Sequence, residues 1–104
     1  MIYFVDIDGT ICNNTFGDYE RAIPVKENIK KINNLFDEGH TIIYWTARGT
    51  QTGKSWKELT LLQFKKWGVK FHDLKFQKPH YDLFIDDKSI NAETFFKESK
   101  IVAR

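Results

Sequence analysis

Two aspartates separated by a single residue stand where the first apolar run of the chain ends. Asp6 and Asp8 occur in the stretch FVDIDGTI, which covers residues 4–11. Carboxylates this close repel each other, so either they share a counter-ion or the site is open to water. The polar residues that follow the other apolar runs help to decide between these two explanations.

Further polar residues follow apolar runs in the same way. Thr46 ends the run of residues 42–45, and Asp86 and Asp87 directly follow the run of residues 83–85. Ligands bind at the carboxyl ends of strands in parallel sheets, so we expect these side chains to meet at one edge. Converging carboxylates require a cation. Oxygen ligands without a cluster of His or Cys favour Mg²⁺, the usual ion beside phosphate.

The elements that would position these residues alternate between strand and helix. Apolar runs and helical periodicity, with proline, capping and glycine signals at the helix ends, define the elements. We expect strands at residues 2–7, 40–46, 69–76 and 82–85, and helices from Val25 to Gly39, from Ser55 to Gly68 and over 91–98. Residues 9–24 are polar and rich in turn residues, and predict a loop or small flap.

This alternation predicts an α/β fold in one domain spanning residues 1–104. We expect a three-layer, Rossmann-like parallel sheet with helices on both faces and a first strand buried on both sides. Within the second helix, Leu59, Leu62 and Trp67 are expected to form the apolar stripe.

Composition narrows the classes of partner. Apolar residues make up 41% of the chain and aromatic residues 15%, which supports a packed core and argues against disorder. The 16 basic and 14 acidic side chains give a net charge of only +2, so neither a membrane nor a nucleic acid is an expected partner.

The position of the cysteine and of the first charges bears on the compartment. Cys12 is the single cysteine, so no disulfide framework exists and a reducing compartment is expected. The first apolar run is interrupted by Asp6, too early for a signal peptide or a membrane span. We therefore expect a cytoplasmic protein.

Four short motifs occur in an order that characterises one enzyme superfamily. They are Asp6-Ile7-Asp8-Gly9-Thr10 after the first strand, Thr46 after the second, Lys78 before the fourth, and Asp86-Asp87 after it. In these motifs the chain resembles the haloacid dehalogenase (HAD) superfamily, most of whose members are phosphatases. The resemblance covers nearly the whole chain and implies the HAD-like version of the fold.

The resemblance implies roles for the acidic residues. Asp6 would be the nucleophile that attacks phosphorus and forms an aspartyl-phosphate. Asp8 would protonate the leaving oxygen and then deprotonate the attacking water. Asp6, Asp8 and Asp87 would bind Mg²⁺, Asp8 also through its backbone carbonyl. Asp86 would either bind the ion directly or support the residues that do, and the resemblance leaves that choice open.

The resemblance also implies residues that contact the phosphoryl group. Thr46 would donate a hydrogen bond to it, and Lys78 would offset the negative charge of nucleophile and phosphate. Lys75 and Lys54 are alternatives for this lysine.

The sequence after Thr46 suggests further substrate contacts. Together with Thr46, Ala47 and Arg48 are candidate substrate-binding residues, and Arg48 could clamp a distal phosphate or carboxylate of the substrate. The alternative is that Arg48 is an ordinary arginine of a surface loop.

The expected loops leave no room for the cap domain that many HAD phosphatases carry. Residues 11–22 hold about a hairpin, and residues 48–77 are filled by a loop, a helix and a short strand. A capless, open site suits a large or extended substrate, or a site that a neighbouring subunit of a homo-oligomer closes.

The resulting expectation is a Mg²⁺-dependent phosphomonoester hydrolase. Small capless relatives include sugar-phosphate phosphatases of surface-polysaccharide synthesis, so the resemblance implies a phosphorylated sugar or polysaccharide precursor as substrate. The alternatives are a receiver-like domain that accepts a phosphoryl group, a metal-binding module without turnover and a nucleic-acid end phosphatase. The near-neutral charge weakens the last of these.

Overall fold

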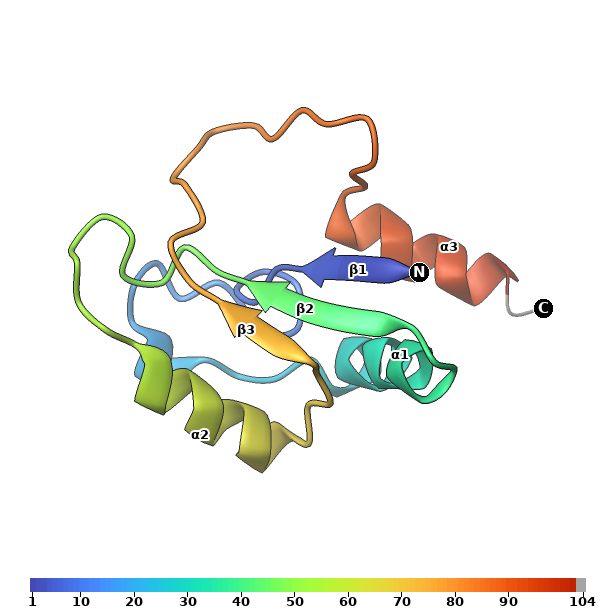
Figure 1. Ribbon diagram of the computed structural model, residues 1–104, viewed down its shortest axis with the longest axis horizontal. Helices are drawn as coiled ribbons and strands as arrows, with labels where there is room; N and C mark the ends of the chain where they lie inside the picture. Colours follow the sequence, from blue (N-terminus) through green and yellow to red (C-terminus); the bar gives the residue numbers. More distant parts are fainter. Residues whose placement is uncertain (103–104) are drawn as a thin grey trace.

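Three parallel strands in the order β1-β2-β3 form the sheet, and helices connect them (Figure 1). The computed structural model describes residues 1–102, with the side chains of residues 1–97. The elements are β1 (Ile2–Val5), a 3₁₀ helix η1 (Tyr19–Arg21), α1 (Lys26–Asp37), β2 (Thr41–Trp45), α2 (Lys57–Trp67), β3 (Asp73–Lys75) and α3 (Ala92–Val102). The predicted α/β class is confirmed.

The register brings the carboxyl ends of the strands to one edge of the sheet. β1 pairs with β2 so that Val5 lies opposite Tyr44, and β2 pairs with β3 so that Trp45 lies opposite Lys75. The helices α1 and α2 return the chain between parallel strands and lie on the same face of the sheet (Figure 1). The residues directly after each strand therefore lie close together.

Glycines end both connecting helices, as predicted. Gly39 follows α1 with φ +96°, and Gly68 caps α2 with φ +71°, a backbone conformation that side chains with a Cβ disfavour. The predicted starts were less accurate. α1 begins after Val25, two residues beyond Pro24, and α2 begins after Trp56 without a side-chain cap, so the expected capping box at Ser55 is not formed.

The core lies between the sheet and the two connecting helices. Ile42 and Tyr44 of β2 alternate inward and are fully buried, and Phe64 of α2 packs against Tyr44 with ring centroids 5.0 Å apart. The predicted stripe of α2 was right for Trp67, which packs against the core, and wrong for Leu62, which is 63% exposed; the buried residues of α2 are Thr60, Gln63 and Phe64. Thr60 and Gln63 tolerate burial because they have a charged partner, described below.

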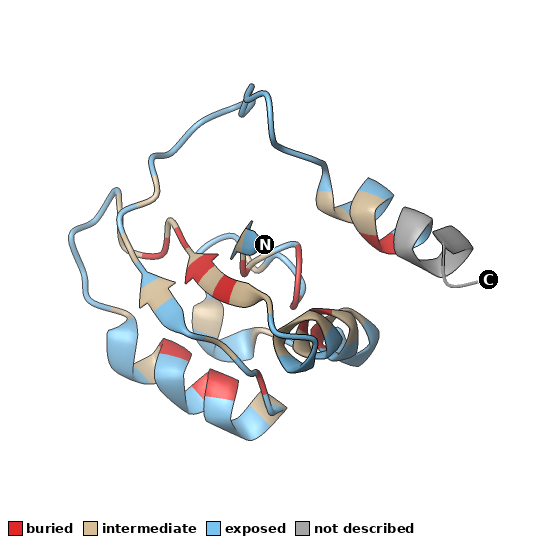
Figure 2. Cartoon of the chain, turned by 45° about the vertical axis from the view of Figure 1, so that its right-hand side comes forward, coloured by how far each residue is buried: buried red, intermediate tan, exposed pale blue. Residues whose placement is uncertain are grey.

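The opposite face of β1 is open to solvent. Ile2 is 67% exposed and Phe4 is 57% exposed, so the expectation of a first strand buried on both faces was wrong. The segment that leads from β3 to α3 is also mostly exposed (Figure 2). The three-layer arrangement is thus not confirmed. α3 instead lies beside α1, where Lys31 donates a hydrogen bond of 3.1 Å to the carbonyl of Phe96, whose side chain is buried.

The expected fourth strand is not formed. Residues 76–91 contain neither helix nor strand and connect β3 to α3 along a wide arc (Figure 1). Leu83 and Ile85 are 75% and 88% exposed. The expectation for residues 82–85 was wrong because a strand needs a hydrogen-bonded neighbour, and these residues have none in the described chain. None of the helices in the described residues is both long and apolar enough to cross a membrane.

Candidate active site

Three of the predicted site residues follow consecutive strands and meet at the carboxyl edge of the sheet. Asp6 follows β1, Thr46 follows β2, and Lys78 lies three residues after β3. The amide of Thr46 donates to the carbonyl of Lys75 at 2.9 Å, and the amide of Lys78 donates to the carbonyl of Thr46 at 3.0 Å. These bonds extend the β2–β3 pairing and fix the backbone at Lys78.

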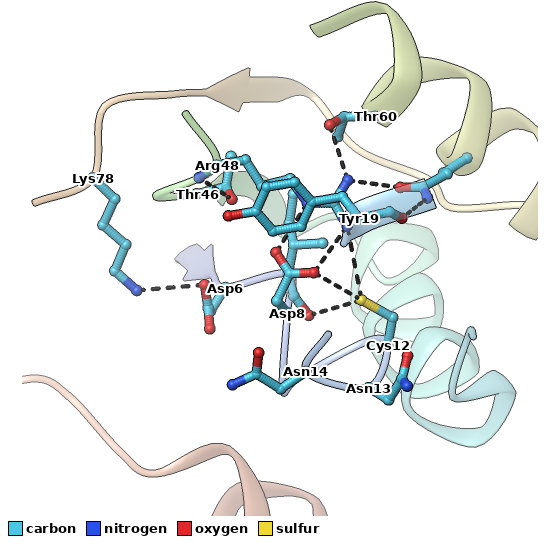
Figure 3. Close-up of polar contacts among 12 residues, drawn as sticks. Asp6, Asp8, Cys12, Asn13, Asn14, Tyr19, Thr46, Arg48, Thr60 and Lys78 are labelled. Carbon is cyan, nitrogen blue, oxygen red and sulfur yellow. Dashed lines mark hydrogen bonds and ion pairs between the residues drawn. The ribbon is translucent and has the colours of Figure 1, made fainter. Parts of the chain in front are cut away.

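Asp6 faces the ammonium group of Lys78 (Figure 3). Lys78 Nζ lies 3.6 Å from Asp6 Oδ1, and the side chains are 13% and 39% exposed. Burial raises the pKa of the Asp6 carboxyl above its usual range, although the ammonium of Lys78 acts in the opposite direction. Ile7, the residue between the aspartates, is fully buried, as expected.

Of the three candidate lysines, Lys78 is the one that contacts Asp6. Lys75 forms an exposed ion pair with Asp73 at 3.5 Å, and Lys54 lies against a tryptophan ring on the β2–α2 loop. The geometry therefore favours Lys78 over the two alternatives that the sequence left open.

Asp8 has a different cation. Arg48 Nε donates to Asp8 Oδ2 and Arg48 Nη2 donates to Asp8 Oδ1, each at 2.9 Å, so the guanidinium binds both carboxylate oxygens (Figure 3). The Arg48 side chain is 0% exposed and that of Asp8 is 16% exposed. The close carboxylates are thus compensated separately, Asp6 by Lys78 and Asp8 by Arg48.

The expectation that Arg48 is an ordinary arginine of a surface loop was wrong, and the observed contacts do not support the substrate clamp. Arg48 is neither exposed on a loop nor free to clamp a substrate, because its remaining donor also binds the protein. Nη1 donates to Thr60 Oγ1 at 3.0 Å and to Gln63 Oε1 at 2.6 Å, and the ring of Tyr19 lies 4.8 Å from the guanidinium. Gln63 Nε2 in turn donates to the carbonyl of Tyr19 at 2.7 Å.

Thr60, Gln63 and Tyr19 were missed by sequence reasoning. The available signal was that Thr60 and Gln63, three residues apart, share a helix face with the core residue Phe64. Polar residues on a buried face need partners, so this pattern indicated a buried polar or charged group opposite α2.

Cys12 lies behind Asp8. Its Sγ is 3.5 Å from Asp8 Oδ1 and 3.6 Å from the carbonyl of Ile7, and the residue is 1% exposed. Burial, with a smaller contribution from the Asp8 charge, raises the pKa of the thiol to about 12. Cys12 is therefore a packing residue and not a nucleophile in this state.

The other predicted contact residues lie on the turn after β2. Thr46 is 1% exposed, and its Oγ1 accepts a hydrogen bond of 3.1 Å from the amide of Arg48. Ala47 is half-buried, and its carbonyl accepts from the amide of Thr50 at 3.0 Å. Thr46 is thus beside the nucleophile candidate, with its hydroxyl proton still able to donate.

Asp86 and Asp87 do not reach the other carboxylates. Both are exposed in residues 76–91, and no group of at least three His, Cys, Asp or Glu side chains within the described residues could hold a metal ion. The expected convergence at one edge was therefore wrong for these two residues, because the strand that would carry them is not formed. The residues brought together here do not complete a Mg²⁺ site.

Aromatic rings surround the ammonium of Lys78. Its Nζ lies 5.8 Å from the ring centre of Trp45, 5.3 Å from that of Tyr81 and 6.0 Å from that of Phe84. Tyr81 and Phe84 are 41% and 40% exposed and lie against each other, with ring centroids 5.3 Å apart. Apolar ring surface is thus available next to Asp6.

Comparison with known proteins gives a fold but no family. No protein-family model matches the chain, and no curated protein matches it. A crystal structure of a target protein from Vibrio cholerae has a similar fold, with a TM-score of 0.82 and 23% sequence identity. The match covers 91% of this chain and 86% of that one. Similarity at this identity supports the α/β fold alone.

Proposed function

We propose that this protein is a phosphomonoester hydrolase of the HAD type that forms an aspartyl-phosphate on Asp6. The observation that carries the proposal is the position of Asp6, at the carboxyl end of β1 and 3.6 Å from Lys78 Nζ. A carboxylate beside a fixed cation suits attack on phosphorus, because the cation offsets the charge that nucleophile and phosphate bring together. The hydroxyl of Thr46 supplies a donor on the adjacent strand end.

The first step would transfer the phosphoryl group to the protein. A carboxylate oxygen of Asp6 forms a bond to phosphorus as the bond from phosphorus to the ester oxygen breaks. The leaving oxygen takes a proton from solvent or from Asp8 in its protonated form. An aryl oxygen leaves without this help far more readily than an alkyl oxygen, so aryl phosphates are the appropriate first substrates.

The second step would return the enzyme to its starting state. A water oxygen bonds to phosphorus as the bond to Asp6 breaks, and the water proton passes to a carboxylate oxygen of Asp8. In the observed arrangement both oxygens of Asp8 accept hydrogen bonds from Arg48, which fixes the orientation of the carboxylate.

We also propose Mg²⁺ as the cofactor, which requires a change from the observed arrangement. Oxygen-only ligands and a phosphoryl substrate favour this ion. Asp86 or Asp87 would have to approach Asp6, and the exposed apolar residues Leu83 and Ile85 beside them favour such a docking. If residues 83–87 docked beside Asp6, the sheet would also come closer to the HAD-like arrangement that we propose.

The proposed substrate is a phosphorylated sugar or polysaccharide precursor. The rings of Trp45, Tyr81 and Phe84 beside Lys78 support this class, because aromatic faces bind the apolar faces of sugar rings next to the reacting phosphate. A cavity of about 430 Å³ lies between the β2–α2 loop and the residues after β3; it is lined in part by Lys54, Trp56, Lys57 and Gln77, and not by Asp6 or Lys78.

Phosphate release from a generic aryl phosphate tests the proposal. We expect activity that EDTA abolishes and added Mg²⁺ restores, and that Asp6→Asn abolishes. The exposed Asp73→Asn is the matched control and should keep full activity, because the Asp73 carboxylate contacts only Lys75 and the amide of Leu74 among the described residues, and neither is a proposed site residue. Activity that survives Asp6→Asn would refute the proposed nucleophile, and a stable phospho-aspartate without phosphate release would favour the receiver-like alternative.

A further inference from the structure

One buried side chain connects the candidate base to two other parts of the fold. Arg48 binds Asp8 with two donors and α2 with a third, while Tyr19 of the flap (residues 9–24) covers its guanidinium. We propose that Arg48 is a positioning residue that fixes the orientation of Asp8 and couples it to the flap and to α2. The inference rests on the proposed function, because it assigns Asp8 the role of base.

The geometry at Asp8 requires a guanidinium. Two parallel hydrogen bonds of 2.9 Å to different oxygens hold the plane of the carboxylate, which a single donor would leave free to rotate. A lysine at position 48 would keep the positive charge, but its ammonium cannot reproduce this planar pair of bonds. Arg48→Lys therefore separates orientation from charge.

The remaining contacts of Arg48 extend the same network. Nη1 donates to Thr60 Oγ1 and Gln63 Oε1, and Gln63 Nε2 in turn donates a hydrogen bond to the carbonyl of Tyr19. The flap, α2 and Asp8 are thus joined through a single cation that solvent does not reach. In such a network each bond depends on its neighbours, so the loss of the guanidinium is expected to loosen all three.

The step that this positioning serves is hydrolysis of the aspartyl-phosphate. There, water loses a proton to Asp8 while its oxygen bonds to phosphorus, and a poorly oriented carboxylate slows the step. Misplacement of a catalytic group by about 1 Å can cost about 100-fold in rate. A residue that clamped the substrate would instead affect its binding.

Steady-state kinetics with a generic aryl phosphate separate the two roles. We expect Arg48→Lys to lower kcat by about 10- to 100-fold while KM changes by less than about 2-fold. The matched control is Arg21→Lys in the same flap, whose arginine side chain is 84% exposed and forms an exposed ion pair with Asp18; it should behave as wild type. A rise in KM with kcat retained would overturn the proposal in favour of a substrate clamp.

The amount of phosphoenzyme distinguishes positioning from a merely structural role. Acid quenching during turnover should show a larger phosphorylated fraction in Arg48→Lys than in wild type, because dephosphorylation is the slowed step. If Arg48→Lys stays folded but its phosphorylated fraction falls together with kcat, that result would overturn the proposal.

Labelling of Cys12 by iodoacetamide tests the network without any enzyme assay. Its thiol touches Asp8 and is 1% exposed, so it should label at least about 10-fold faster in Arg48→Lys, through local opening of the flap. Asp6→Asn, which lies outside the network, should label like wild type. Faster labelling in a protein without phosphatase activity would support the network and refute the proposed function, whereas unchanged labelling would overturn the inference.

If Arg48→Lys does not fold, Thr60→Val provides a milder test. It removes one acceptor of Nη1 while keeping the shape of the side chain and the bonds to Asp8. We expect the same direction of change in kcat, phosphoenzyme and Cys12 labelling. Wild-type values for all of these would overturn the inference.

Discussion

Replacing Arg48 with methionine removes the buried cation while keeping a side chain of similar length. The substitution leaves the Asp8 carboxylate, 16% exposed, without its partner, and deprives Thr60 and Gln63 of a donor. Breaking a buried ion pair by removing one partner costs about 3–5 kcal/mol. We therefore expect Arg48→Met to lower the free energy of unfolding by about 3 kcal/mol or more, a large part of the 5–15 kcal/mol typical of a domain.

Lys78→Met is the matched control for this prediction. It also removes a cation from an aspartate, but the Asp6 side chain is 39% exposed and the Nζ–Oδ1 distance is 3.6 Å. A long ion pair with one partner this open to solvent is expected to contribute at most about 1 kcal/mol. Urea unfolding at neutral pH, followed by tryptophan fluorescence, gives both free energies.

A double mutant tests where the cost comes from. If the unpaired Asp8 carboxylate dominates, Asp8→Asn combined with Arg48→Met should be more stable than Arg48→Met alone, because the buried charge is gone. Equal losses in Arg48→Met and Lys78→Met would refute the reasoning, since they would show that the network around Arg48 adds nothing beyond a surface ion pair.

Two further substitutions test the carboxyl group of Asp6 and the buried hydroxyl of Tyr44. The pKa of Asp6 is raised, so the contribution of this carboxyl to stability is fully present below its usual pKa of 3.8 and is lost as pH rises through the raised pKa. Asp6→Asn should therefore raise the melting temperature at pH 7, and the difference from wild type should shrink toward pH 3. A difference in melting temperature that widens in acid would contradict this. Tyr44 Oη is buried without a hydrogen-bond partner among the described residues. Tyr44→Phe should therefore raise the free energy of unfolding, measured by urea unfolding, by about 1 kcal/mol. A loss of stability would show that the hydroxyl has a partner.

The parts of the fold that local signals specify could be predicted from the sequence. Apolar runs located β1 and β2, Gly39 and Gly68 ended the helices, and the rule for parallel sheets brought Asp6 and Thr46 to one edge. These features depend on neighbouring residues and on the order of elements, both of which a sequence displays.

The parts that depend on distant partners could not be predicted. Arg48 looks like an exposed loop residue until α2 and Asp8 are placed around it, and its burial depends on those distant partners. Residues 82–85 have the composition of a strand, but composition does not provide the neighbouring strand with which they would pair. That Asp6 and Asp8 pair with different cations, Lys78 and Arg48, could not be predicted either, because each pair joins residues far apart in the sequence.

The identity of the phosphorylated residue tests the central claim most directly. Wild-type protein should be mixed with an aryl phosphate and Mg²⁺, quenched in acid within the first turnovers, and analysed by peptide mass spectrometry. The account predicts one phosphoryl group on the peptide that contains Asp6, labile to hydroxylamine and absent from Asp6→Asn. Phosphate on another residue, or phosphate release by Asp6→Asn at the wild-type rate, would contradict it.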